Sequence, residues 1–508
     1  MASMNNQDLP YDVWEHIATF LSSEKKKGLL SVNRALFDIA MDERYHSVTI
    51  GPLSRADTQK ALARLTDPGV ASRVRQLVFE PGFICKSLVQ EDFAKKLSLR
   101  GHTKATTDVK LIQSVSTRGL ATVPDTYSEK NREIPMDDAV GKILLIMSLL
   151  TNLRSLTVDI NLLDYWDFQK NPIPFFKPGW STFGNNIQSL NLLVPLEALP
   201  HILPAPNNNF PNLHTLSCLI VRAGRSNVSA TDVLLPFLEE HRFSLRSLTV
   251  DQTEKASLSP LLELLHLPSL AHFKLVQPYF EAGLPDYSGL QHFFKEHRSH
   301  LRRFEIVVGI HSRRVYQTYP IFTDKCFSTP LPKLEHLNID FSPGDVYGPL
   351  LSGSLSDYVH QFTASLVSLR IGFGRSLFMT DLKTLTEGFR HARLRSLEIT
   401  VFFEPGLFTI LSTNIPGLDT LNLTVNMSAS FRSLSRSVQL DPVPTIRAMC
   451  FSQWHLRNLN LEFPHKGNSR LLISHYLQKK ESREALLEAL PNVKMFCGMG
   501  REEYYNSD

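Results

Sequence analysis

The sequence lacks most of the features that mark an enzyme or a metalloprotein. It has five cysteines in 508 residues, spaced far apart and without a Cys-x-x-Cys pair, so neither a zinc site nor a disulfide framework is expected. It also lacks the Gly-x-Gly-x-x-Gly, phosphate-loop and Gly-x-Ser-x-Gly motifs that accompany nucleotide binding or nucleophilic catalysis. We therefore expect no catalytic residues, no metal and no cofactor.

Long apolar runs and a strong charge of one sign are missing as well. The most apolar stretch covers residues 143–150, far fewer than the ~20 residues that span a bilayer. The first residues show no basic start followed by an apolar run, so no signal peptide is expected. Lysines and arginines number 54 against 50 aspartates and glutamates, a balance that does not favour nucleic acid. We expect a cytoplasmic and/or nuclear protein that binds neither a membrane nor nucleic acid.

The sequence does contain a repeated motif. A leucine is followed by two variable residues, an apolar residue, one variable residue and another apolar residue, as in Leu245-Arg-Ser-Leu248-Thr-Val250. Clear copies begin at Leu153, Leu213, Leu245, Leu270, Leu301, Leu334, Leu366, Leu394, Leu418 and Leu456, and degenerate copies begin at Val74, Ile187 and Leu490. From Leu153 onward the copies are about 24 to 38 residues apart, longer on average than the 20–29 residues of a regular leucine-rich repeat.

The spacing within each copy predicts the fold. The last two apolar positions lie two residues apart, which is the period of a strand with one buried face. Leucines at helical spacing precede some strands, as in residues 261–265. One strand and one helix cannot bury their apolar faces alone, so stacked copies are needed. Residues 70–497 are therefore predicted to form an α/β solenoid like that of leucine-rich-repeat proteins, with parallel strands inside and helices outside.

Three segments depart from this rhythm. Residues 100–134 are polar and without periodicity, and we predict a flexible insertion there. Residues 476–490 are charged on one side and apolar on the other, which predicts a helix that caps the repeats. Residues 498–508 are predicted to be a polar tail.

The first fifty residues have the pattern of a small, separate all-α module. Pro10 suits the start of a helix, and apolar residues from Val13 to Leu21 then lie on one helical face. Asn33 is placed to cap a further helix that carries Leu36 and Ala40 on one side. So small a module has more apolar surface than it can bury within itself, and part of that surface should face a partner or the first repeat.

Residues 8–50 resemble an F-box, as found in fungal members of that family. The resemblance rests on Leu9-Pro10, on the apolar helix that follows, on Leu30-Ser-Val32-Asn33-Arg34, and on residues 44–50, where the chain enters its first strand. It implies that the module docks on a Skp-type adaptor and through it on a cullin. The repeats would then present an unidentified target protein for ubiquitin-dependent degradation. The residues implied in adaptor binding are Leu9, Pro10, Val13, Ile17, Leu21, Leu30 and Val32.

Polar side chains that alternate with the repeat leucines must point away from the core, and they are the candidate target-binding residues. They are Arg303, Glu305, His336, Asn338, Asp340, Arg370 and Glu398. A solvated polar face is the alternative for each of them. A second alternative concerns the whole chain, which could be a non-catalytic leucine-rich-repeat scaffold acting outside a ubiquitin ligase.

Two further clusters have competing interpretations. His297 and His300 are three residues apart, but His297 recurs as His241 in another repeat, which favours a role in the repeat framework over metal binding. Aromatic residues between 165 and 180 form either a binding patch or packing between repeats.

Overall fold

The structure, a computed structural model, describes residues 9–28, 32–82, 84, 136–160, 175–204, 210–221, 229–252, 258–279, 286–310, 322, 324–341, 353–372, 376–402, 404, 406–426, 443–462 and 480–506. The predicted insertion at 100–134 lies outside these ranges. The chain divides into two compact units, Met1–Ser244 and Leu245–Asp508. Each unit is built of parallel strands and helices, so the predicted α/β class is observed in both.

The first unit begins with three helices, α1 (Tyr11–Thr19), α2 (Ser23–Gly28) and α3 (Arg34–Tyr45). The side chain of Asn33 caps α3, as predicted, by accepting a hydrogen bond from the Leu36 backbone N–H at 2.8 Å. Among the described residues of these helices, few apolar side chains are buried, namely those of Ala18, Leu36 and Ala40. The three helices together are called the N-terminal module below.

The strands of the first unit pair in chain order, each parallel to the next. They are β1 (Ser47–Ile50), β2 (Gln76–Phe79), β3 (Ser155–Asp159), β4 (Ser189–Pro195) and β5 (Thr215–Val221). The helices that follow them are α4 (Ala56–Leu65), α5 (Pro68–Ala71), α8 (Met136–Leu149), α9 (Phe176–Phe183), α10 (Leu199–Ile202) and α11 (Ala230–Glu240). The parallel sheet therefore starts at β1, earlier than the predicted boundary at residue 70, because the buried side chain of Ile50 aligns with that of Phe79.

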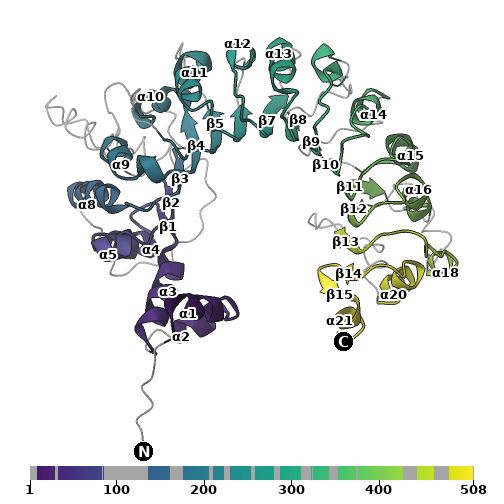
Figure 1. Cartoon of the computed structure of the whole chain (residues 1–508), viewed down its shortest axis with the longest axis horizontal. Coiled ribbons are helices and arrows are strands. Elements are labelled where there is room, and N and C mark those ends of the chain that lie inside the picture. The colour runs from purple at the N-terminus through teal and green to yellow at the C-terminus, as the bar shows by residue number, and fades with distance from the viewer. Residues whose placement is uncertain are drawn as a thin grey trace, which may run out of the picture. The chain divides into compact units, whose positions relative to one another are not determined.

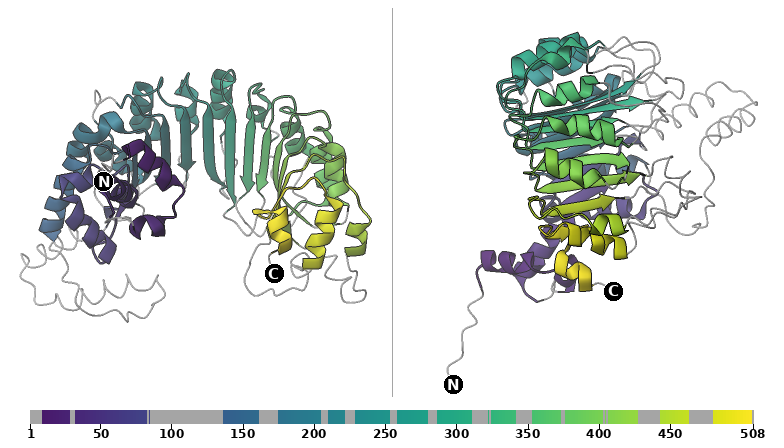
Figure 2. Two further views of the ribbon diagram at one scale, coloured as in Figure 1. Left: turned by 60° about the horizontal axis from the view of Figure 1, so that its bottom comes forward. Right: turned by 90° about the vertical axis from the view of Figure 1, so that its right-hand side faces the viewer.

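The second unit continues the alternation of strands and helices, and its helices lie on one face of its strands (Figures 1 and 2). Its strands are β6 (Ser247–Gln252), β7 (His272–Tyr279), β8 (Arg303–Ile310), β9 (His336–Phe341), β10 (Ser368–Gly372), β11 (Ser396–Phe402), β12 (Thr420–Asn426), β13 (Asn458–Glu462), β14 (Met495–Phe496) and β15 (Met499–Gly500). Its α-helices are α12 (Ser259–Leu264), α13 (Ser288–His297), α14 (Gly353–His360), α15 (Met379–Glu387), α16 (Leu407–Asn414), α18 (Val443–Arg447), α20 (Lys480–Ala489) and α21 (Arg501–Asn506).

The repeat motif accounts for the core of both units. The two apolar strand residues of each clear copy are buried, for example Leu156 and Val158 on β3 or Leu337 and Ile339 on β9. Neighbouring copies are in register, so that Leu337 aligns with Leu369. Burial of one leucine is worth roughly 1.5–3 kcal/mol, and stacking repeats this gain at every strand.

The C-terminal end of the second unit closes with α20 and a short hairpin. The predicted capping helix is observed from Lys480 to Ala489, with Leu486 and Leu487 buried. The segment predicted as a polar tail contains β15 and α21, and the Tyr504 ring packs against that of Phe496 at 5.1 Å. Cys497 and Gly498 have φ angles of 50° and 81°, which let the chain reverse so that β15 runs antiparallel to β14.

His297 and His241 belong to the repeat framework. His297 is fully buried, its Nδ1–H donates to the Phe293 carbonyl at 2.7 Å, and its Nε2 accepts from the Leu267 backbone N–H at 3.0 Å. His241 is buried at the same place in its own repeat and stacks on Phe210. Within the described residues, no cluster of histidine, cysteine and acidic side chains could hold a metal ion.

Candidate partner-binding surfaces

The N-terminal module exposes an unusual density of large apolar side chains. Across the described residues thirteen such side chains are exposed, and seven of them lie between residues 9 and 37. Single exposed apolar residues are normal, whereas several on one small module make it a candidate interaction surface. This group, called the module surface, consists of Leu9, Tyr11, Val13, Ile17, Phe20, Val32 and Phe37.

The residues predicted for adaptor binding fall mostly on this surface. Leu9 and Val32 are 46% and 59% exposed, and Val13 and Ile17 are each 36% exposed. Pro10 is exposed as well, Leu21 is half-buried, and Leu30 lies outside the described residues. Tyr11, Phe20 and Phe37 were not among the predicted residues. Phe20, the most exposed of all at 76%, carried a signal in the sequence, since it shares a helical face with Val13 and Ile17.

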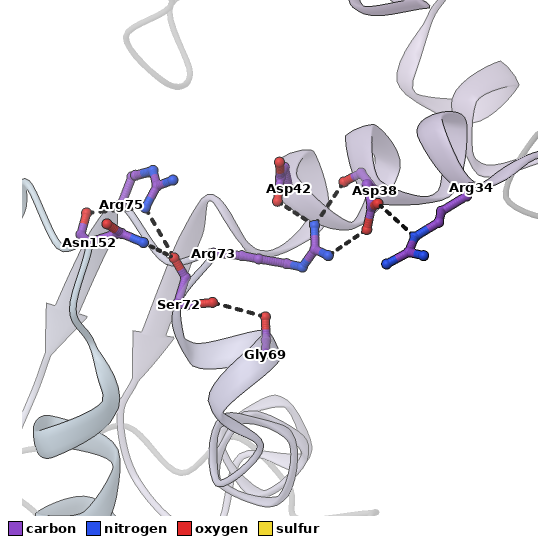
Figure 3. Close-up of polar contacts among 8 residues, drawn as sticks. All are labelled: Arg34, Asp38, Asp42, Gly69, Ser72, Arg73, Arg75 and Asn152. Carbon is purple, nitrogen blue, oxygen red and sulfur yellow. Dashed lines mark hydrogen bonds and ion pairs between the residues drawn. The ribbon is translucent and has the colours of Figure 1, made fainter. Parts of the chain in front are cut away.

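Ion pairs fasten the N-terminal module to the first repeat (Figure 3). Arg73, in the turn between α5 and β2, reaches α3, where its Nη2 lies 2.6 Å from Asp38 Oδ1 and its Nη1 lies 2.5 Å from Asp42 Oδ1. Nη1 also donates to the Asp38 backbone carbonyl at 3.0 Å. Charge-assisted hydrogen bonds of this fork geometry fix orientation as well as distance, so Arg73 holds α3 against the start of the sheet.

The helix-free face of the second unit displays its outward side chains in rows, because the strands are parallel and in register. The first row contains Ser247, His272, Arg303, His336, Ser368, Ser396, Thr420 and Asn458. The second row contains Thr249, Lys274, Glu305, Asn338, Arg370, Glu398, Asn422 and Asn460. The third row contains Asp251, Val276, Val307, Asp340 and Gly372 on β6 to β10, and Thr400, Thr424 and Glu462 on β11 to β13.

Glu305 is the centre of a charged cluster on this face. Its side chain is only 8% exposed, although its position in the strand points away from the core. Oε1 lies 2.7 Å from Arg303 Nε and 3.2 Å from His272 Nε2, and Oε2 lies 3.5 Å from Lys274 Nζ. Asn338 Nδ2 donates to Oε2 at 3.4 Å. The His272 ring and the Arg303 guanidinium hold the pKa of Glu305 at about 2, so this carboxylate stays ionised and its partners are engaged with it.

The remaining predicted residues lie along the same face. Arg370 Nε pairs with Glu398 Oε1 at 3.2 Å across β10 and β11. His336 is exposed in the first row, and Asp340 is half-buried in the third. The structure thus brings Arg303, Glu305 and Asn338 into one cluster, with Arg370 and Glu398 as a separate pair.

Sequence reasoning missed His272 and Lys274 as members of the Glu305 cluster. A signal was present, because they occupy the same two positions of their repeat as Arg303 and Glu305 occupy in the next.

The described aromatic residues between 165 and 180 pack between repeats and do not form an exposed binding patch. Phe175, Phe176 and Trp180 are buried, and Trp180 Nε1–H donates to the Ile202 carbonyl at 2.7 Å. The other aromatics of that cluster, Tyr165, Trp166 and Phe168, lie outside the described residues. No helix in the described ranges is long and apolar enough to cross a bilayer.

Comparisons with known proteins give a distant likeness to solved structures. No family model and no curated protein matches the chain. Among solved structures, the chain is similar to the leucine-rich repeat-containing protein LegL7 from Legionella pneumophila, at 12% sequence identity and a TM-score of 0.36. That match covers 70% of this chain and 94% of the other. The repeat architecture described above therefore rests on the strands, helices and register of this chain itself.

Proposed function

We propose that this protein is the target-recognition subunit of a Skp–cullin–F-box ubiquitin ligase. The N-terminal module docks on a Skp-type adaptor, and the helix-free sheet face binds a target protein. The chain performs no chemistry in this role. It raises the effective concentration of a target lysine near a charged conjugating enzyme.

The module surface is the observation that carries this proposal. Its apolar side chains are exposed on helices whose own buried core is limited to a few small or medium side chains. Apolar surface of this density is stabilised when a partner covers it. The sequence of these helices resembles an F-box, and Leu9, Pro10 and Val32, which carry part of the resemblance, are exposed.

A non-catalytic scaffold outside any ligase is the second candidate. The ion pairs between Arg73 and α3 favour this candidate, because they join the module to the repeats. In that case the module surface would serve another partner, and no Skp-type adaptor would copurify with the chain.

Copurification with a Skp-type adaptor tests the proposal. The double variant Leu9→Ala with Ile17→Ala removes two apolar anchors from the module surface, and adaptor binding should fall more than tenfold. Leu264→Ala is the matched control, because Leu264 is a 57% exposed leucine on α12 in the second unit. It should bind the adaptor as the native chain does.

The double variant Leu9→Ala with Pro10→Ala tests the start of α1 separately. Both residues lie outside the repeat core, so the melting temperature of the repeats should not change while adaptor capture is lost. Adaptor capture that survives both double variants would leave the scaffold role as the better account.

A further inference from the structure

The third row of the helix-free face in the second unit carries two valines between two acids. Asp251 aligns with Val276, Val276 with Val307, and Val307 with Asp340, on the adjacent strands β6 to β9. All four side chains are half-buried. Because neighbouring strands lie ~4.8 Å apart, the two aspartates are roughly 14 Å apart along the row. These four residues are called the Asp–Val–Val–Asp row.

The negative charge of this row is not compensated by close partners in the described part of the chain. Two cations on the same face, Lys274 and Arg303, contact Glu305 at 3.5 Å and 2.7 Å. Neither Asp251 nor Asp340 has an ion pair or side-chain hydrogen bond to another described residue. Burial raises the pKa of Asp251, and the positive charge of Lys274 opposes this rise.

Gly372 provides the space in which the Asp340 carboxylate lies. A Cβ atom at Gly372 would come within 2.7 Å of Asp340 Oδ1. The Asp340 carboxylate therefore extends over β10, and a side chain in place of Gly372 would obstruct it.

We propose that the Asp–Val–Val–Asp row binds an extended protein segment that crosses β6 to β9, with two basic residues four positions apart and an apolar residue midway. In an extended segment residues i, i+2 and i+4 point to the same side, and i and i+4 are about 13 Å apart. The two basic heads then meet Asp251 and Asp340, and their aliphatic stems and the middle side chain lie on Val276 and Val307.

A helical segment fits this row less well than an extended one. An α-helix returns to the same face about every 3.6 residues, so its same-face residues nearest to this span are about seven or eleven positions apart, which is roughly 11 or 16 Å. An acidic or phosphorylated segment is disfavoured by the charge of the row. The inference rests on the proposed function, in that it names the chemistry of the target that the sheet face would bind.

Selection from a displayed library of random peptides against the immobilised full chain tests this inference. The selected peptides should share a basic residue, an apolar residue and a second basic residue at positions i, i+2 and i+4. A synthetic peptide of the selected sequence should bind about tenfold more weakly to the double variant Asp251→Asn with Asp340→Asn, because two ion pairs are lost. Gly372→Ala should also weaken binding, since it displaces the Asp340 carboxylate while the charge remains.

Glu462→Gln is the matched control, because Glu462 is an exposed acid of the same row on the distant strand β13. It should leave the affinity unchanged. The inference is overturned by a selection without this pattern, by equal binding to the double variant, or by a scrambled peptide of the same composition that binds as well. Adaptor capture by the double variant should be normal, so failure of the peptide test is distinguishable from failure of the proposed ligase role.

Discussion

The N-terminal module and the repeats differ in how far their large apolar side chains are exposed. In the repeats, a strand residue such as Leu337 is 2% exposed because the strand before it and the strand after it both cover the same layer. In the module, Phe20 remains 76% exposed at the C-terminal end of α1. The apolar face of one repeat packs against the next repeat of the same chain. Three short helices have too little volume to bury one another's apolar side chains. The difference indicates that the repeats bury their large apolar side chains within the chain, whereas the module leaves several of its own exposed.

Substituting one apolar residue by aspartate in each region should show the largest difference in stability between the two regions. Leu337→Asp buries an unpaired charge between stacked strands, and we expect the free energy of unfolding of the second unit to fall by about 4 kcal/mol. Phe20→Asp adds a charge to an exposed site, and we expect a change of less than about 0.5 kcal/mol. Denaturant unfolding followed by circular dichroism measures both. Equal destabilisation by the two variants would contradict the division between the regions.

Acid should weaken the repeats through His297. Desolvation in the core holds the pKa of His297 at about 4, below its ordinary value of 6.5, and its Nε2 must be neutral to accept the hydrogen bond from Leu267. As the pH falls through 6.5 the unfolded chain takes up this proton first, so stability present above pH 6.5 is lost progressively down to about pH 4. The loss is on the order of 3 kcal/mol.

The variant His297→Gln isolates this contribution. It should be less stable than the native chain at pH 7, and its unfolding free energy should depend less on pH between 6.5 and 4. His336→Gln is the control, because His336 is exposed on the sheet face and should leave the pH dependence as it is. Parallel pH profiles for the native chain and His297→Gln would show that His297 does not titrate in this way.

Loss of the Arg73 ion pairs should free the N-terminal module from the repeats. Arg73→Ala removes the bonds to Asp38 and Asp42, whose side chains are partly exposed, and we expect a local cost of about 1–2 kcal/mol. Hydrogen exchange of the α3 amides should accelerate while exchange in the repeat strands stays the same. Arg55→Ala breaks the more exposed pair with Glu80 and should have a smaller effect. Unaltered exchange in α3 would mean that helix packing alone holds the module.

Local patterns in the sequence predicted most of the elements. The two-residue spacing of Leu248 and Val250 placed β6, and Asn33 placed the start of α3, because strand alternation and helix capping involve residues close together in the chain. The Glu305 cluster was predicted only in part. Its members come from β7, β8 and β9, and the residues that separate these strands differ in number from repeat to repeat. The contact between Arg73 and α3 was not predicted, since no periodic pattern marks it.

The sequence by itself determined the α/β repeat, the buried leucines and the existence of an apolar helical module, since each depends on spacing over a few residues. Tertiary structure alone decided which polar side chains meet. The burial of Glu305 among His272, Arg303 and Lys274, and the placing of two valines between Asp251 and Asp340, follow from the register of neighbouring strands. Register is a property of how whole repeats stack, because one strand aligns with the next through the combined packing of every buried leucine.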